Sequence, residues 1–151
     1  MNRSKLRQWW IQFLRPKGAY DEIDPGIKPL VDAMNATGVI KTIASCQGHA
    51  SYGMPPYVYF NSTVEVAGLI ERQLRKSKID SAISFGGDWT IQGMFDEHCE
   101  LRFILYSPFY HERSETLFAP IEFTLYRRTI AKDLLSLVDQ VDKAVLPDVR
   151  E

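Results

Sequence analysis

The chain has 151 residues, 45% of them hydrophobic and 25% charged, and its 18 basic and 19 acidic residues give a formal net charge of −1. This length is typical of one domain, and the composition excludes a disordered tail or a low-complexity scaffold. The charge balance excludes a bulk nucleic-acid binder of the histone type, and no apolar run approaches the roughly 18 residues that span a bilayer.

The cellular compartment is predicted from the first residues and the cysteines. Arg3, Lys5 and Arg7 precede only a short apolar stretch without a small-residue cleavage site, so no secretory signal is expected. Two cysteines are too few for a disulfide scaffold. We therefore expect a cytoplasmic protein with reduced thiols and no membrane association. The sequence leaves the oligomeric state open.

The first predicted element is a basic, amphipathic helix from Ser4 to Leu14, ended by Pro16 and Gly18. Five basic residues and no acidic one fall within residues 1–17. This helix, within residues 1–18, either docks its apolar face on the core or binds a nucleic acid or a protein partner, and residues 19–151 form a single α/β domain. Its apolar face consists of Leu6, Trp9, Trp10, Phe13 and Leu14.

The elements that follow are predicted from capping residues, β-branched runs and apolar periodicity. In chain order they are a helix capped by Asp24, or beginning nearer Lys28, to about Asn35, and strands over Val39–Ala44 and Tyr57–Phe60. A helix capped by Asn61, Ser62 or Thr63 then runs to about Lys76.

The second half of the chain is predicted to begin with a hairpin, because Gly86-Gly87-Asp88 separates two apolar runs. The fold class is α/β (α+β): a single two-layer domain with a mixed β-sheet and helices mainly on one face. The elements are strands over Ile79–Phe85, Trp89–Phe95 and Glu100–Tyr106, a loop over Pro108–Glu115, an edge strand over Ile121–Tyr126, and a helix over Thr129–Leu146 with Asp133 on its outer face.

One segment carries chemically versatile side chains. A strand containing Thr42 leads into the turn Ser45-Cys46-Gln47-Gly48-His49, which offers a hydroxyl, a thiol, an amide and an imidazole. Ligand sites of α/β sheets usually lie at the carboxyl ends of strands. Gly48 permits a positive φ, and exposed N–H groups of a turn can hold an anion. The sequence therefore predicts a site at this turn.

The segment from Ile23 to Phe60 resembles the tRNA wybutosine-synthesis methyltransferase family, in which a strand leads to a Ser-Ser-Cys-Ser-Gly-Arg turn. The resemblance extends more weakly to about Gly93, and it implies a tRNA-modifying activity that uses S-adenosylmethionine. His49 replaces the family's arginine and Gln47 its second serine, so a permanent cation gives way to a group that titrates near neutral pH. The matching residues are Leu30-Val31, Asn35, Thr42 and Ala44-Ser45-Cys46-Gln47-Gly48-His49.

The leading functional hypothesis is recognition of a nucleotide or an RNA-like ligand. Ser45, Gln47 and His49 would contact the ligand together with Thr42, and Gly48 would permit the turn. Aromatic rings can stack on a base. The predicted stacking residues are Tyr57, Tyr59 and Trp89.

Two further hypotheses are kept. One is an enzyme, with Cys46 as nucleophile and His49 as its base, or with bound S-adenosylmethionine; spacing identifies no acid partner for His49. The other is an inhibitor or regulator that acts through the helix containing Trp9 and Trp10.

A zinc ion is a possible cofactor, although no metal ligand is assigned. Cys46-x-x-His49 has a spacing that zinc sites use. His98 and Cys99 would add only one ligand, because neighbouring side chains of an extended segment point to opposite faces. The plain alternatives are a structural turn with Cys46 buried beneath it, a core Cys99 and a surface His98.

Overall fold

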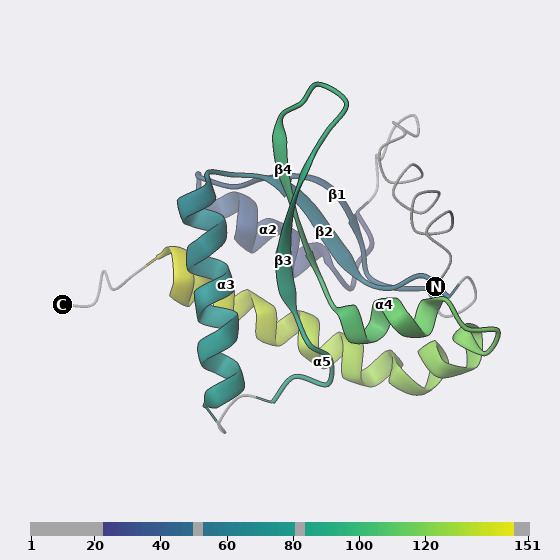
Figure 1. Ribbon diagram of the computed structural model, residues 1–151. Coiled ribbons are helices and arrows are strands. Elements are labelled where there is room, and N and C mark those ends of the chain that lie inside the picture. Colours follow the sequence, from purple (N-terminus) through teal and green to yellow (C-terminus); the bar gives the residue numbers. More distant parts are fainter. Residues whose placement is uncertain (1–22, 50–52, 81–83, 147–151) are drawn as a thin grey trace.

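The computed structural model describes residues 23–49, 53–80 and 84–146. The predicted helix with Trp9 and Trp10 lies outside these residues. No helix among the described residues is long and apolar enough to cross a membrane. In chain order the elements are α2 (Lys28–Ala36), β1 (Lys41–Cys46), β2 (Tyr57–Asn61), α3 (Val64–Ile79), β3 (Thr90–Phe95), β4 (Leu101–Tyr106), α4 (Pro108–Ser114) and α5 (Ala119–Val145) (Figure 1).

The four strands form one sheet in the order β1-β2-β4-β3. The predicted α+β class is confirmed, but all pairings between these strands are antiparallel, where a mixed sheet was expected. Two further expected strands are not part of this sheet: Ile121–Tyr126 lies in α5, and of Ile79–Phe85 the described residues are the end of α3 and loop. What remains is two antiparallel pairs, β1–β2 and β3–β4, joined through the central strands β2 and β4.

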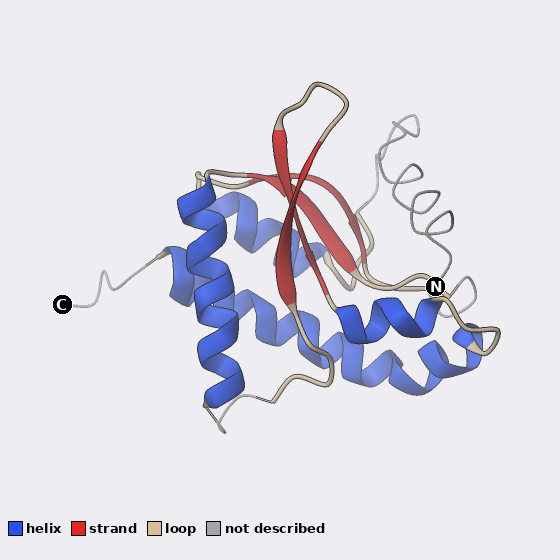
Figure 2. Cartoon of the chain, viewed as in Figure 1, coloured by secondary structure: helices blue, strands red, loops and turns tan. Residues whose placement is uncertain are grey.

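Helices pack on one face of the sheet and form the main core. Side chains of β2 and β4 that point to this face, such as Phe60 and Leu105, contact the apolar sides of α2, α3 and α5. Figure 2 shows the helices gathered beside and behind the strands, with the β3–β4 hairpin extending beyond them. Of the three predicted N-cap residues of α3, Asn61, Ser62 and Thr63, the structure uses Thr63, whose Oγ1 accepts a hydrogen bond of 3.2 Å from Val66 N.

The predicted hairpin around Gly86-Gly87-Asp88 is wrong. Residues up to Ile79 belong to α3, and Gly86 and Gly87 lie in the connection to β3. Their N–H groups donate to the Asp133 carboxylate at 2.8 and 3.0 Å. A Cβ atom on Gly87 would lie 2.5 Å from the Tyr110 ring. These glycines therefore permit close packing of the connection on the helices, not a turn between strands.

Two further expectations between 108 and 126 are wrong. The predicted loop is helix α4: Ser107 Oγ accepts from Tyr110 N, and Pro108 stands where a helix tolerates proline. The predicted edge strand over Ile121–Tyr126 is the beginning of α5. Of its alternating apolar residues only Phe123 is buried, on the same side of the helix as Ala119 and Ile130, whereas Ile121 and Leu125 are exposed.

Candidate metal centre

The turn after β1 is held in shape by its own backbone. Gly48 has a φ of 87°, which favours glycine, and its N–H donates to Cys46 Sγ at 3.3 Å. His49 then pairs with Met54 through two backbone hydrogen bonds of 3.0 and 3.1 Å. The chain thus reverses direction immediately after the thiol, and this brings the Cys46 and His49 side chains toward each other.

Asp24 completes the cluster from a distant part of the sequence. Its backbone oxygen accepts from Ile27 N and Lys28 N at the beginning of α2, while its side chain turns toward β1. Asp24 Oδ2 accepts from Gln47 N at 3.2 Å and lies 3.0 Å from His49 Nε2. From its position in the sequence Asp24 is predicted to cap a helix, and spacing along the chain identifies no acid partner for His49. The structure supplies that partner.

Gln47 connects the two segments that carry the cluster. Its Oε1 atom accepts a hydrogen bond of 2.6 Å from Gly26 N. A Cβ atom on Gly26 would lie 2.5 Å from the same Oε1 atom, so glycine permits this approach. Gln47 therefore positions the loop of Asp24 against the turn, and its amide oxygen is engaged within the protein rather than directed at a ligand.

The thiol of Cys46 is protonated at neutral pH. Only 4% of the residue is exposed, and burial raises the pKa of the thiol to about 11, against the lowering effect of the Gly48 N–H. The negative charge of Asp24 raises this pKa further. Such a thiol is a poor nucleophile by itself, because the thiolate is the reactive species. A bound divalent cation would displace the proton and give a thiolate ligand.

Asp24, Cys46 and His49 can each offer one ligand atom, and these atoms lie within 4.8 Å of one another. The Asp24 and His49 side chains are 29% and 34% exposed, so solvent reaches the cluster. His98 and Cys99 do not join it; they lie beyond the end of β3, where both are exposed. The expectation of a buried Cys99 is wrong, whereas the surface position of His98 is confirmed.

The other predicted ligand-binding residues near the turn are mostly engaged in hydrogen bonds or strand pairing within the protein, or are buried. Thr42 is bonded to the Asn35 side chain through both its N–H and its hydroxyl oxygen, at 3.0 and 2.8 Å. Ser45 is partly exposed and pairs with Val58 of β2. Tyr57 and Tyr59 are only 7% and 6% exposed, so their rings offer no accessible stacking surface in this structure.

Trp89 lies apart from the turn. Its ring belongs to the core on the helical side, whereas Cys46 belongs to the cluster on the opposite face of the sheet. Its Nε1 atom donates to Asp133 Oδ2 at 3.0 Å. The structure therefore does not bring Trp89 together with Cys46 and His49, and the prediction that these residues share one site is wrong for Trp89.

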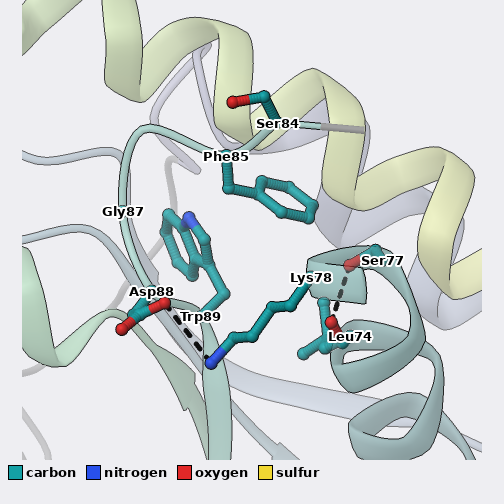
Figure 3. A pocket seen from close by; sticks show the side chains of 8 residues that line it. All are labelled: Leu74, Ser77, Lys78, Ser84, Phe85, Gly87, Asp88 and Trp89. Atoms are coloured by element: carbon teal, nitrogen blue, oxygen red, sulfur yellow. Dashed lines mark hydrogen bonds and ion pairs between the residues drawn. The ribbon is translucent and has the colours of Figure 1, made fainter. Parts of the chain in front are cut away.

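Trp89 instead lines a cavity of about 270 Å³ between α3 and the connection to β3 (Figure 3). Phe85 and Lys78 line it as well, and Lys78 Nζ lies 3.3 Å from Asp88 Oδ1. This volume is just below the range of about 300–1,000 Å³ typical of small-molecule sites. Lys78 is the only cation among the described residues that line it, and it is already paired with a carboxylate, so the cavity is a weaker candidate than the cluster at the turn.

Comparison with protein-family models, with curated proteins and with solved structures finds no match to this chain. The resemblance to the wybutosine-synthesis family therefore stays a prediction.

Proposed function

We propose that Asp24, Cys46 and His49 bind a zinc ion. The observation that carries this proposal is the convergence of a thiol, an imidazole and a carboxylate within 4.8 Å. Zinc sites in proteins use these three donor types, at about 2.0–2.3 Å from the metal. A thiolate ligand favours zinc and other soft or borderline metals over magnesium and calcium, which prefer oxygen ligands.

The number of protein ligands indicates the kind of site. Structural zinc sites use four protein ligands, whereas catalytic sites use three and keep one position for water or substrate. Asp24, Cys46 and His49 supply three, and the exposure of Asp24 and His49 gives solvent access. We therefore propose a site that holds an exchangeable water or an anionic ligand group next to zinc.

The surrounding hydrogen bonds support a ligand role for these side chains. The Gly48 N–H points at the sulfur and the Gln47 N–H at the Asp24 carboxylate, and each would stabilise the charged form of its partner. Outer hydrogen bonds of this kind orient metal ligands and tune the metal. Nucleotide recognition and S-adenosylmethionine binding at the same turn stay predictions, and the burial of Tyr57 and Tyr59 gives the first of them less support.

The test is a zinc titration of the full chain after removal of metals with a chelator. We expect one zinc ion per chain by native mass spectrometry and a single site by calorimetry. The variants C46S and H49N should weaken zinc binding by at least about 100-fold, because each removes a ligand.

The β3–β4 hairpin provides matched controls. C99S and H98N change the same residue types at exposed positions, and both should bind zinc as the unchanged chain does. Cobalt substitution gives a second readout, because a thiolate charge-transfer band should be present in C99S and absent in C46S. Unchanged zinc affinity in both C46S and H49N would refute the proposal.

A further inference from the structure

The outer face of α5 carries large apolar side chains along its whole length. The opposite face, which holds the buried residues from Ala119 to Ala144, packs against α2, α3 and α4. The outer face of such a helix is usually polar, because water contacts it. Five large apolar side chains of this outer face are instead 53–75% exposed, namely Phe118, Ile121, Leu125, Leu135 and Leu146. Exposed apolar side chains gathered on one face mark an interaction surface.

The exposed residues recur at the spacing of a coiled coil. Between residues 118 and 146, positions separated alternately by three and four residues are all exposed, and we call them the α5 stripe. Two helices pack side by side through such a pattern, at about 8–10 Å between their axes. Because α5 has 27 residues, it is about 40 Å long and offers a continuous contact. The α5 stripe consists of positions 118, 121, 125, 128, 132, 135, 139, 142 and 146.

The charged residues of the α5 stripe are separated by sign. Arg128 and Lys132 come first along the helix, and Asp139 and Asp142 follow. Within the described residues neither Arg128 nor Lys132 forms an ion pair, and Asp139 lies 2.7 Å from Lys143 of the same helix. The stripe therefore has a cationic part and an anionic part, and each could neutralise the other on a second copy.

A second copy in antiparallel orientation matches the order of these charges. With a two-fold axis between residues 133 and 134, Arg128 of each copy faces Asp139 of the other, and Ile121 faces Leu146. A parallel pair would place Arg128 against Arg128 and Asp139 against Asp139, which like-charge repulsion disfavours. The charges thus select the antiparallel arrangement.

The centre of this arrangement is apolar. Leu135 of each copy lies next to the axis and opposite Lys132 of the other. The methylene groups of Lys132 can pack on Leu135 while the ammonium group stays in water. A lipid surface fits the stripe less well, because anionic headgroups would attract Arg128 and Lys132 but repel Asp139 and Asp142.

We propose that this chain forms a two-fold dimer in which the α5 stripes of two copies pack antiparallel. The same residues of both copies form the interface, as in other two-fold dimers. The proposal is independent of zinc binding, because Asp24, Cys46 and His49 lie outside the α5 stripe.

The first test is sedimentation velocity of the full chain over a range of concentrations, with a chelator that excludes metal bridging. We expect the mass of two chains, falling to that of one on dilution. L135E should raise the dissociation constant at least about 100-fold, because it buries two like charges beside the axis. The control is V64E, at a 62% exposed position that begins α3. A single chain at every concentration would overturn the proposal, and so would a dimer that L135E leaves unchanged.

The second test reads the antiparallel contact from charge reversal. R128D and D139R should each weaken the dimer at least about tenfold, because each places like charges opposite one another. An equimolar mixture of the two variants should associate about as tightly as the unchanged chain, because both contacts then join opposite charges. The thermal unfolding of the separated chains should not change, since both positions are exposed. A mixture that associates no better than either variant alone would overturn the antiparallel dimer, whether or not L135E folds.

Discussion

Two aspartates in this protein have opposite surroundings. Asp133 of α5 is 1% exposed, and its carboxylate accepts hydrogen bonds from Gly86 N, Gly87 N, Trp89 Nε1 and Tyr110 OH. Asp24 has a side chain that is 29% exposed, and it contacts one backbone N–H and one imidazole beside a thiol.

The comparison shows how burial and partners separate a structural carboxylate from a chemically available one. The four donors around Asp133 come from a fixed backbone and from buried rings. They occupy the acceptor positions of the Asp133 carboxylate, which is therefore not available to a ligand. The groups around Asp24 can exchange one partner for another, because the imidazole and the thiol also bind metals. Asp133 therefore holds the fold together, whereas Asp24 belongs to a site.

The largest expected effect comes from removing the Asp133 carboxylate. D133A leaves three buried donors and the part-buried Gly86 N–H without their acceptor and should destabilise the protein by about 3–5 kcal/mol. Urea denaturation of the metal-free chain measures this change. D139A, at an exposed position of the same helix, is the control and should change stability by less than about 0.5 kcal/mol. A loss below 1 kcal/mol in D133A would remove the distinction between the two aspartates.

Zinc should stabilise the folded chain through the other aspartate. At a free zinc concentration 100 times the dissociation constant, linkage gives about 2.7 kcal/mol of added stability. D24N should lose most of this gain while its metal-free stability changes little. D32N, at an exposed position of α2, should keep the gain. Thermal melts with and without zinc give the comparison, and an equal gain in D24N would contradict the ligand role of Asp24.

The glycine beside Asp133 gives an intermediate effect. In G87A the added methyl group would meet the Tyr110 ring and Ser107 Oγ at 2.5 and 2.6 Å, which should cost about 1–3 kcal/mol. G68A is the opposite case, because nothing lies within 4 Å of a Cβ there and alanine favours the helix by about 0.5–1 kcal/mol. We expect the denaturation midpoint to fall in G87A and to rise in G68A. A change in the same direction in both variants would mean that the connection containing Gly87 relaxes freely.

The smallest effect concerns the buried imidazole of α4. Burial lowers the pKa of His111 below its usual value of 6.5, and the charges of Glu115 and Glu112 only partly offset this. The unfolded chain then binds this proton first as pH falls, so stability is lost as pH decreases through 6.5 toward the lower folded-state pKa. H111Q should show a shallower loss between pH 7.5 and 5 than the unchanged chain, and H98Q, at an exposed histidine, should not.

Much of the fold follows from local sequence signals. Three of these signals act over only a few residues, so each element was predictable from its own segment. They are the N-cap Thr63 of α3, the proline at the beginning of α2 and the alternation in β4. The wrong assignments have a common cause. Gly86-Gly87 fits a tight turn or a close contact, and Phe123 fits an alternating strand or, with Ala119 and Ile130, one side of a helix; only the packing partners decide between these patterns.

The candidate site was also predictable only in part from local sequence. Cys46, Gly48 and His49 lie within four positions of one another, so the sequence by itself determined that a thiol and an imidazole share a turn. Only the tertiary structure brought in Asp24, placed Asp133 inside the core and set Trp89 and Cys46 on opposite faces of the sheet. The physical reason is that capping and periodicity are local properties of the backbone, whereas a carboxylate's partners are chosen by the packing of distant elements, which no spacing along the chain records.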